Sequence, residues 1–275
     1  MVKKSLPHDV IMTKASNAPV LAICYAQGWC ANENYMTATE AAAVTNIGTV
    51  FYNNKDIEHF EEFEYFTGVT SIVNNGFRNC TNLLTLTIPE NVASFGNDAF
   101  RDNGVKTLII KALNIATWGN DWTLYNNVIE YFYSNATVTS PLTQGHTLSR
   151  LKKLKTLVLD SNVRTVSNFG YSSVESVTIA EGVTTFNDNC FKGCSSLESI
   201  VLPSTTSVMT HGVFNTCANL TSVTILATTP PTGVSTYTFQ NSPNAQVYVP
   251  AESVETYKSA SGWSQWASRI QAIPT

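Results

Sequence analysis

The residues that could support catalysis are few and lie far apart along the chain. None of the four histidines has a cysteine, serine or carboxylate at a spacing that suits nucleophilic or metal chemistry: His8, His59, His146 and His211. Asp121 and Glu130 are the only carboxylates in the aromatic segment 118–133, and nothing indicates that they flank a substrate as a glycosidase pair would. We therefore predict that the protein is not an enzyme and uses no cofactor.

An acidic cluster between positions 58 and 64 could bind a cation. Its members are Glu58, Glu61, Glu62 and Glu64. Carboxylates are the ligands that hard cations prefer, but carboxylates that flank a strand are equally well solvated by water alone. We favour the solvated flank and predict no metal site in this cluster.

Aromatic side chains are the second group that could carry a function. They gather between Ile110 and Leu154, at Trp118, Trp122, Tyr125, Tyr131, Phe132 and Tyr133. Aromatic residues on a rigid scaffold suit the recognition of a protein or a glycan, and they also suit a repeat whose enlarged core needs filling. Trp118 and Trp122, on a long connection, are candidate binding residues.

A repeated phrase, apolar-x-x-apolar-x-apolar, defines the elements that must position these residues. Its clearest copies begin at Leu83, Val105, Leu154, Val174, Leu197 and Leu220, and weaker copies lie at Ile57, Val128 and Val247. Successive copies up to Leu220 begin 20 to 26 residues apart, and the copy at Ile57 is one residue too long. A period in this range predicts a solenoid, in which each coil packs on its neighbours.

Residues inside the phrase alternate as they do in a β-strand, so every second side chain points into the coil. In the copy that begins at Leu83, Leu86 and Ile88 point inward, whereas Thr85 and Thr87 point outward. Stacked coils then form a parallel sheet over an apolar interior. In the irregular coil, the same frame places Tyr131 and Tyr133 inward.

Most outward strand positions carry threonine or serine, but three successive coils place an apolar residue outward. These residues are Ile109, Phe132 and Val158. Contiguous exposed apolar side chains mark interaction surfaces, although β-branched residues also pack well against each other on any sheet. We predict a binding site centred on Phe132 and flanked by Ile109 and Val158. Glu130 and Thr156 would form its polar rim.

The repeat also resembles a known family. The pattern Phe-x-x-Cys-x-x-Leu-x-x-Val-x-Ile-Pro is similar to the leucine-rich repeat of the BspA-like surface proteins of anaerobic bacteria, and residues 77–89 and 191–203 match it nearly throughout. The resemblance covers residues 44–249. It implies a leucine-rich repeat solenoid, a right-handed superhelix that is mostly β, with a parallel sheet on one face and short helical caps. It also implies a secreted or cell-surface protein and a function in adhesion.

Three parts of the chain follow from this fold. Residues 1–45 are an N-terminal segment and helical cap, 46–249 are a solenoid of about nine coils that is irregular at 111–153, and 250–275 are a C-terminal helical cap. We expect short helices at 37–44, 253–258 and 261–268. Thr37 and Glu40 have the spacing of a capping box, and Trp263 and Trp266 are expected to cover the last coil.

A calcium loop of the EF-hand kind often precedes the first helix in the relatives that the chain resembles. With Glu40 at the last position of such a loop, the first ligand positions fall on Trp29, Ala31 and Glu33. Calcium needs oxygen ligands at these places, and the side chains of Trp29 and Ala31 have none. We therefore predict that this segment does not bind calcium.

The cysteines separate into two groups. Three of them recur at one place in the repeat, three residues after a phenylalanine: Cys80, Cys194 and Cys217. The recurrence predicts a small buried residue, and we favour free core thiols over a Cys194–Cys217 disulfide. Cys24 and Cys30 lie outside the repeats and could pair in an oxidising compartment. Cys190 has no assigned role.

Composition limits the partners and the location. Charged residues make up 13% of the chain and its net charge is −4, which argues against a nucleic-acid partner and a polybasic membrane patch. No stretch reaches the roughly 20 apolar residues of a membrane-spanning helix. The short apolar run 19–26 lacks the basic start of an export signal. We expect a mature, secreted or cell-surface chain whose signal has been removed; lipid anchoring of the precursor stays open.

Several functions fit these features. We favour a binding module that recognises a protein or glycan on a host or neighbouring cell surface, as in adhesion. The alternatives are a structural spacer, about 40 Å long at one strand spacing per coil, and a carbohydrate-binding protein that uses the aromatic segment 118–133. The ligand and the oligomeric state stay open.

Overall fold

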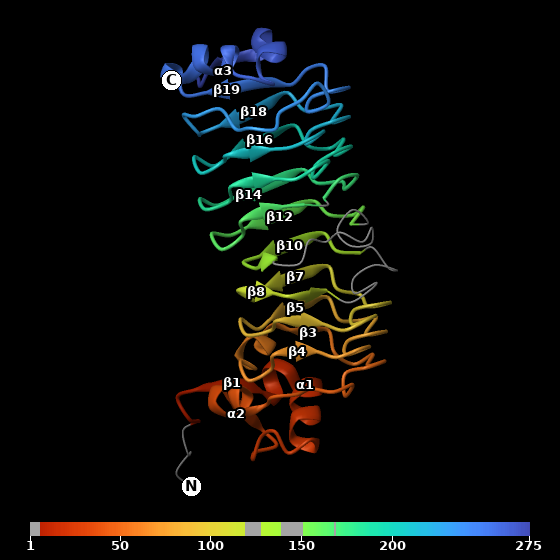
Figure 1. Ribbon diagram of the computed structural model, residues 1–275. Coiled ribbons are helices and arrows are strands. Elements are labelled where there is room, and N and C mark those ends of the chain that lie inside the picture. The colour runs from red at the N-terminus through yellow and green to blue at the C-terminus, as the bar shows by residue number, and fades with distance from the viewer. Residues whose placement is uncertain (1–5, 119–127, 139–150, 168) are drawn as a thin grey trace. The chain divides into compact units, whose positions relative to one another are not determined.

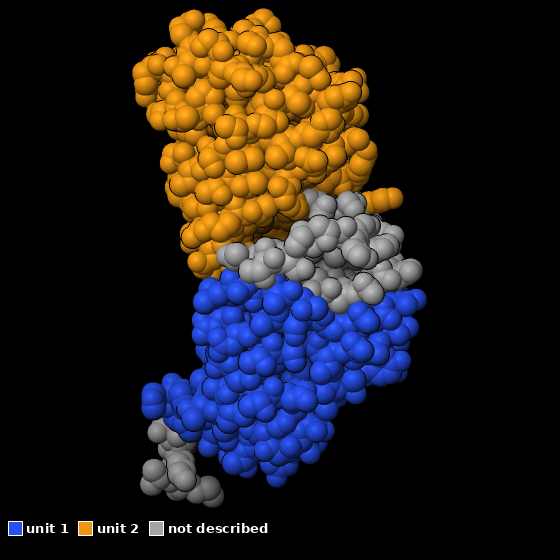
Figure 2. All heavy atoms as spheres, viewed as in Figure 1, with its two compact units in different colours: residues 1–126 blue, residues 127–275 orange. Residues whose placement is uncertain are grey.

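The computed structural model describes residues 6–118, 128–138, 151–167 and 169–275 (Figure 1). The chain divides into two compact units, Met1–Asn126 and Asn127–Thr275, which are coloured separately in Figure 2. Each unit contains stacked coils whose strands pair in parallel. The predicted parallel β-solenoid is therefore confirmed.

Unit 1 begins with an N-terminal cap of two strands and two helices, and short strands follow. Its elements are β1 (Val10–Thr13), α1 (Lys14–Ala26), β2 (Tyr35–Thr37), α2 (Ala38–Ala43), β3 (His59–Phe60), the 3₁₀ helix η1 (Glu61–Tyr65), β4 (Ser71–Ile72), β5 (Thr85–Ile88), β6 (Ser94–Phe95), β7 (Thr107–Ile110), β8 (Asn114–Ile115) and β9 (Thr117–Trp118). Strands β1 and β2 pair antiparallel. Strands β3, β5 and β7 form one parallel sheet, and β4, β6 and β9 form another.

Unit 2 contains longer strands on one side of each coil, shorter strands on the other, and a C-terminal cap. Its elements are β10 (Tyr131–Ser134), β11 (Thr137–Val138), β12 (Thr156–Leu159), β13 (Thr165–Val166), β14 (Ser176–Ile179), β15 (Thr185–Phe186), β16 (Ser199–Leu202), β17 (Val208–Met209), β18 (Ser222–Ile225), β19 (Gln246–Val249), the 3₁₀ helix η3 (Ala251–Ser253), α3 (Val254–Ser259), the 3₁₀ helix η4 (Ser264–Arg269) and β20 (Ile270–Ala272).

Three parallel arrays connect the strands of unit 2. Strands β10, β12 and β14 form the first array, and β16, β18, β19 and β20 form the second. The shorter strands β13, β15 and β17 form the third. In β18, Val223 and Ile225 are buried while Ser222 and Thr224 are part-exposed, as strand alternation predicts.

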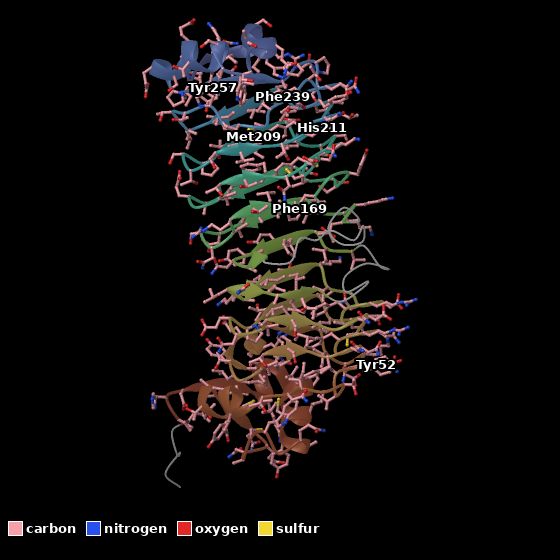
Figure 3. All side chains as sticks on the ribbon, viewed as in Figure 1. Tyr52, Phe169, Met209, His211, Phe239 and Tyr257 are labelled. Carbon is pink, nitrogen blue, oxygen red and sulfur yellow. The ribbon has the colours of Figure 1, made fainter. Side chains whose placement is uncertain are left out.

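A column of stacked phenylalanine rings fills the turn side of each unit. Its members are Phe51, Phe77 and Phe100 in unit 1, and Phe169, Phe191, Phe214 and Phe239 in unit 2. Neighbouring ring centroids are 5.3 to 6.3 Å apart. Phe169 and Phe239, which end the column of unit 2, are labelled in Figure 3. Each ring packs on the equivalent ring of the next coil, so the same aromatic contact repeats from coil to coil.

Tryptophans lie at the ends of these columns. Trp263 is fully buried, and its ring and that of Trp266 lie 6.4 and 5.4 Å from Phe239, as expected for a cover of the last coil. Trp29 lies 6.3 Å from Phe51 and covers the first ring in the same way. The sequence analysis did not identify this role of Trp29.

The helices of the N-terminal cap begin with side-chain hydrogen bonds to the backbone of their first turn. Thr37 and Glu40 form the predicted capping box of α2. The apolar run 19–26 lies within α1, which buries Val20 and Leu21 and packs against β1 and β2. Among the described residues, no helix has both the length and the apolar character needed to span a membrane. In the C-terminal cap, α3 and η4 occupy nearly the same residues as the helices predicted at 253–258 and 261–268.

One residue in each turn adopts the left-handed backbone conformation, directly before the position that holds the recurrent cysteine. Asn79, Asp102, Gly193 and Asn241 occupy this place with φ between 57 and 70°. Asparagine, aspartate and glycine tolerate this conformation best. Tyr171 and Thr216 adopt it at φ values of 60 and 61°, where a larger or β-branched side chain is strained.

Candidate functional site

Strand β10 carries the aromatic residues on which the predicted binding site was centred. Phe132 is 2% exposed and pairs in register with the buried Leu157 of β12, so its ring points into the core. The prediction that Phe132 faces outward is therefore wrong. Tyr131 and Tyr133, which were predicted to point inward, are the part-exposed residues of this strand.

The error is a shift of one residue in the strand register. The buried frame of this coil is Ile129, Phe132 and Ser134, in place of Val128, Tyr131 and Tyr133. The sequence pattern did not reveal this frame, because Ser134 is a polar residue at an inward position where other coils have Leu, Ile or Val. Its Oγ accepts a hydrogen bond from the backbone N–H of Ala136 at 3.2 Å, which satisfies the buried hydroxyl. A slip of one residue moves every side chain of a strand to the opposite face.

Tyr133 is held in a fixed orientation on the outward side. Its hydroxyl donates a hydrogen bond to the carboxylate of Asp160, which directly follows β12. Burial, together with this hydrogen bond and the charge of Asp160, raises the pKa of Tyr133 to about 12. The hydrogen bond from Tyr133 is also the main reason that the pKa of Asp160 is lowered. At neutral pH the pair is therefore a neutral phenol that donates to a charged carboxylate.

Thr156 and Val158 are part-exposed on the outward side of β12, as predicted. Thr156 pairs in register with Tyr131, and Val158 pairs with Tyr133. These four side chains are neighbours on one face, and we call them the tyrosine patch.

Glu130 lies at the edge of the tyrosine patch. Its carboxylate is 3.5 Å from the ammonium group of Lys155, and its backbone carbonyl accepts a hydrogen bond from Thr156 N–H at 3.0 Å. Both charged side chains are well exposed, so this ion pair contributes little stability. The predicted rim residues Glu130 and Thr156 thus lie together, whereas the predicted centre, Phe132, lies beneath them.

The other predicted binding residues lie elsewhere. Ile109 is outward and part-exposed as predicted, but it belongs to β7 of unit 1. Trp118 is the last residue of β9, where it pairs in register with Phe95 of β6. Trp122 lies outside the described residues, as does Asp121, the second carboxylate considered for glycoside hydrolysis.

The outward face of unit 1 is partly covered. Thr87 of β5 is only 3% exposed, although its strand position directs it outward. The 3₁₀ helix η1 packs against β5, and Glu64 of this helix forms an ion pair with Lys111, the residue after β7. These contacts account for the burial of Thr87. Thr87 thus has the outward strand position that was predicted, but it is not accessible to solvent.

The recurrent cysteines have a role that the sequence analysis missed. Their thiols donate hydrogen bonds to the carbonyl oxygen of the phenylalanine in the preceding coil. The distances are 2.9 Å from Cys80 to Phe51, 3.4 Å from Cys194 to Phe169, and 3.1 Å from Cys217 to Phe191. In the next coil of unit 2, Ser242 occupies this position, and its hydroxyl donates to Phe214 at 2.6 Å. The position therefore selects a small buried donor rather than a hydrophobe.

Burial makes these thiols unreactive. All six cysteines are free and buried. Desolvation is the main reason that the pKa of Cys24 and of Cys217 is raised to about 12, and it raises the pKa of Cys80 to about 11. A thiolate is the nucleophilic form, and at neutral pH these groups hold their protons.

The side chains of the acidic cluster form polar contacts on the protein surface. His59, Glu61 and Glu62 place potential ligand atoms within 4.8 Å of one another. Glu61 lies 3.0 Å from His59 Nδ1, and Glu62 accepts a hydrogen bond from Asn17 Nδ2 at 3.0 Å. Asn17 Nδ2 also donates to the carbonyl oxygen of His59 at 2.9 Å. The cluster thus ties helix α1 to the first coil.

The segment that was aligned with a calcium loop has structural contacts instead. Trp29 packs on Phe51, and Glu33 lies 3.5 Å from the ammonium group of Lys14. The two oxygens of Glu40 accept hydrogen bonds from the backbone N–H groups of Ala31 and Thr37 at 2.8 and 2.9 Å. These contacts close the N-terminal cap. The absence of calcium binding stays a prediction.

An open hollow of about 580 Å³ lies over the sheet of β4, β6 and β9 in unit 1. Hydroxyl groups from successive coils line it, at Thr49, Ser71, Ser94 and Thr117. None of its lining residues is charged. Gly96 at its floor leaves no room for a Cβ, which would lie 2.4 Å from the backbone nitrogen of Asn74. The hollow is a shallow, uncharged surface with both hydroxyl and apolar lining residues, rather than an enclosed binding pocket.

Comparisons with known proteins agree with this architecture. The BspA type leucine rich repeat region matches the chain in six copies, over residues 45–168 and 144–246. No curated protein matches the chain.

Several solved structures are similar in fold. A leucine-rich repeat protein from Bacteroides ovatus has a TM-score of 0.47 and 16% identity, over 71% of this chain and 54% of that protein. A leucine rich cell surface protein from Faecalibacterium prausnitzii has a TM-score of 0.36 and 16% identity, over 79% of this chain and 66% of that protein. A leucine-rich repeat protein from Eubacterium ventriosum has a TM-score of 0.30 and 18% identity, over 67% of this chain and 64% of that protein. The chain thus spans between 54% and 66% of the length of these proteins.

Proposed function

Because the chain belongs to the BspA-type leucine-rich repeat family, we propose that it is a secreted or cell-surface binding module whose binding surface is centred on the tyrosine patch. The observation that carries this proposal is the pair of outward tyrosines on β10, beside Thr156 and Val158 of β12. Serine, threonine, glutamine and valine occupy most of the remaining outward strand positions in unit 2. The patch is therefore where this face offers the largest aromatic area.

Tyrosine suits this role for two physical reasons. Its ring offers a large contact area with few rotatable bonds, so little conformational entropy is lost when a partner immobilises it. Binding energy in protein interfaces also concentrates in a few desolvated anchors, among which tyrosine is enriched. Tyr133 is already oriented by its hydrogen bond to Asp160, which lowers the entropy cost of binding further.

The chemistry of the patch favours a protein partner with an apolar side chain to place against the rings. Val158 extends the aromatic surface, and Thr156 supplies a hydroxyl beside it. The exposed ion pair of Glu130 and Lys155 forms the rim, where it contributes more to the choice of partner than to affinity. Adhesion to a protein on a host or neighbouring cell surface is the form of binding that we propose.

An array of extracellular-matrix proteins, cell-surface proteins and glycans, probed with the full chain, tests the proposal. The variant Tyr131→Ala should weaken binding to the captured protein about 30-fold, the loss of one anchor worth about 2 kcal/mol. Tyr133→Phe keeps the ring but frees it from Asp160, and we expect a smaller loss. Ser222→Ala and Thr224→Ala, on β18, are the matched controls and should keep full affinity.

Each outcome of the array separates the competing functions. Binding to glycans alone would favour the carbohydrate-binding alternative. Absence of binding to any array member would favour the structural spacer. If a protein partner is found and Tyr131→Ala keeps full affinity, the tyrosine patch is not the binding surface. Circular dichroism of each variant checks that the fold is unchanged.

A further inference from the structure

The sheet on the outward side of unit 2 is interrupted between two successive coils. No ladder joins β14 to β16 within the described residues, although strands on either side of this gap pair along their length. Figure 1 shows both strands on neighbouring coils. We call the gap between β14 and β16 the seam.

Solvent exposure marks the seam independently of the hydrogen bonds. Val177 and Ile179 of β14 are part-exposed, whereas the inward residues of β10, β12, β16, β18 and β19 are all buried. The outward residues of β14 and β16 are exposed, and Val201 reaches 50% exposure. The outward residues of the other four strands are only part-exposed. The outward side of β14 and β16 is therefore more accessible to solvent than that of the other strands.

The sequence explains why pairing fails at one end of the seam. The residue after each strand normally donates its backbone N–H to the preceding coil, as Leu226 does to Leu202 at 3.0 Å and Ala180 does to Leu159 at 2.9 Å. Pro203 occupies this position after β16 and has no N–H to donate. Pro250 occupies it after β19, yet β19 still pairs with β18 at three positions. Proline alone therefore does not open a seam.

Like charges stand at the other end. Glu175 and Glu198 directly precede β14 and β16, so two carboxylates occupy equivalent positions on either side of the seam. The corresponding residues before β10 and β12, Glu130 and Lys155, form an ion pair at 3.5 Å. Like charges on directly opposed residues destabilise strand pairing. In unit 2 the seam combines repulsion at the start of the strands with a missing donor at their end.

The same two coils stay joined on their other sides. Behind the seam, β15 and β17 pair in register at Thr185↔Val208 and Phe186↔Met209. Past the strands, the carboxylate of Glu181 accepts hydrogen bonds from the N–H and the hydroxyl of Ser204 at 3.1 and 2.9 Å. On the turn side, Phe191 and Phe214 stack at 5.9 Å. The coils are therefore attached along the back, whereas no ladder joins them at the front.

We propose that the seam is a hinge. The strands β10, β12 and β14 form one plate, and β16, β18, β19 and β20 form a second. The plates rotate relative to each other about the ladder of β15 and β17. Opening exposes Val177 and Ile179, and closing brings the strands to normal pairing distance. The angle between the two plates, and so the curvature of the outward face, is adjustable at this place. The proposal does not depend on the identity of any ligand.

Hydrogen exchange of backbone amides, followed in the full chain, tests whether the seam is open in solution. The amides of Ser199 and Val201 should exchange at least ~10-fold faster than those of Ser222 and Thr224, because β18 forms a ladder with the coil before it and β16 does not. Pro203→Leu combined with Glu198→Lys restores the missing donor and replaces one of the two like charges, and it should slow exchange at β16. Pro250→Leu, at a ladder that is already formed, is the control and should leave β19 unchanged. Equal protection of β16 and β18 in the unaltered chain would overturn the proposal.

Cross-linking distinguishes a moving hinge from a fixed gap. Cysteines at Ser176 and Ser199 can form a disulfide only when the strands approach to about 4.4–6.8 Å between Cα atoms. The six native cysteines are buried and do not compete. A hinge predicts that Ser176→Cys/Ser199→Cys cross-links under mild oxidation, more slowly than Ser199→Cys/Ser222→Cys across the paired strands. Failure of the seam pair to cross-link, while the paired-strand control does, would mean that the gap is rigid and the hinge is wrong.

Discussion

Strand β5 of unit 1 and strand β18 of unit 2 carry hydroxyl residues at the same outward positions, but their environments differ. Thr87 of β5 is 3% exposed, whereas Thr224 of β18 is part-exposed. Helix η1 packs on β5 and accounts for the difference. Strand alternation thus decides the direction of a side chain, while exposure depends on what another segment places above it. The binding surface is therefore better sought on unit 2.

The two units have similar interiors, although their outward faces differ. Cys80 in unit 1 and Cys217 in unit 2 make the same hydrogen bond to a phenylalanine carbonyl of the preceding coil. The phenylalanine rings stack in the same way in both units. The repeat therefore preserves the interior, which every coil shares with its neighbour, and leaves the outward face free to vary.

The largest expected effect comes from breaking the interior. Val223→Asp would bury a carboxylate with no partner between two coils, because Val223 is fully buried. We expect it to lower the free energy of unfolding by about 4 kcal/mol or more. Ser222→Asp, one residue earlier and outward, should change it by less than about 0.5 kcal/mol. Urea unfolding of both variants measures the difference, and similar midpoints would show that the assigned strand direction is wrong.

The sequence was sufficient to predict these inward and outward directions where the repeat is regular. It predicted the buried Leu86 and Ile88 of β5 and the capping box of α2. It failed where a local substitution hid the frame, as Ser134 did in β10. At the coil that is one residue too long, the sequence analysis did not predict the 3₁₀ helix η1. Only packing reveals that this helix then covers Thr87.

The candidate site was predictable only in part, for the same reason. Thr156 and Val158 were placed correctly because β12 follows the regular repeat. The tyrosines were misplaced because a tyrosine suits both a core and a surface, so composition alone does not choose between the two frames. The hydrogen bond of Tyr133 to Asp160 joins residues 27 positions apart and is not visible in any local pattern.

The next largest effect concerns the covered face. Thr87→Asp would place a carboxylate under η1 at a buried position, and we expect a loss of about 2–3 kcal/mol in the free energy of unfolding. Thr224→Asp makes the same change at the same strand position of β18 and should change it by less than about 0.5 kcal/mol. Parallel urea unfolding curves provide the measurement. Equal tolerance of both variants would contradict the view that η1 seals the outward side of β5.

A smaller effect should be common to both units. Cys217→Ala removes the thiol that donates to the carbonyl of Phe191 and leaves that acceptor buried, so we expect a loss of about 1–2 kcal/mol. Cys217→Ser restores a donor of similar size and should recover most of this loss, because Ser242 serves in the next coil. Cys80→Ala and Cys80→Ser should behave in the same way in unit 1. If alanine is tolerated as well as serine, the position requires only a small side chain.

The smallest effect is a gain in stability. Thr216 adopts φ of 61°, at the turn position where Asn79 and Asn241 stand in other coils. Thr216→Asn should raise the free energy of unfolding by about 1 kcal/mol, because a β-branched side chain is strained in this conformation and asparagine tolerates it. The reverse change, Asn241→Thr, should lower it by a similar amount. Thermal unfolding measures both.

The hydroxyl of Thr216 donates to Asn215 Oδ1 at 2.5 Å, so Thr216→Val separates the lost hydrogen bond from the relieved strain. Valine keeps the branched shape, and a gain in stability from Thr216→Val as large as that from asparagine would argue against strain as the cause.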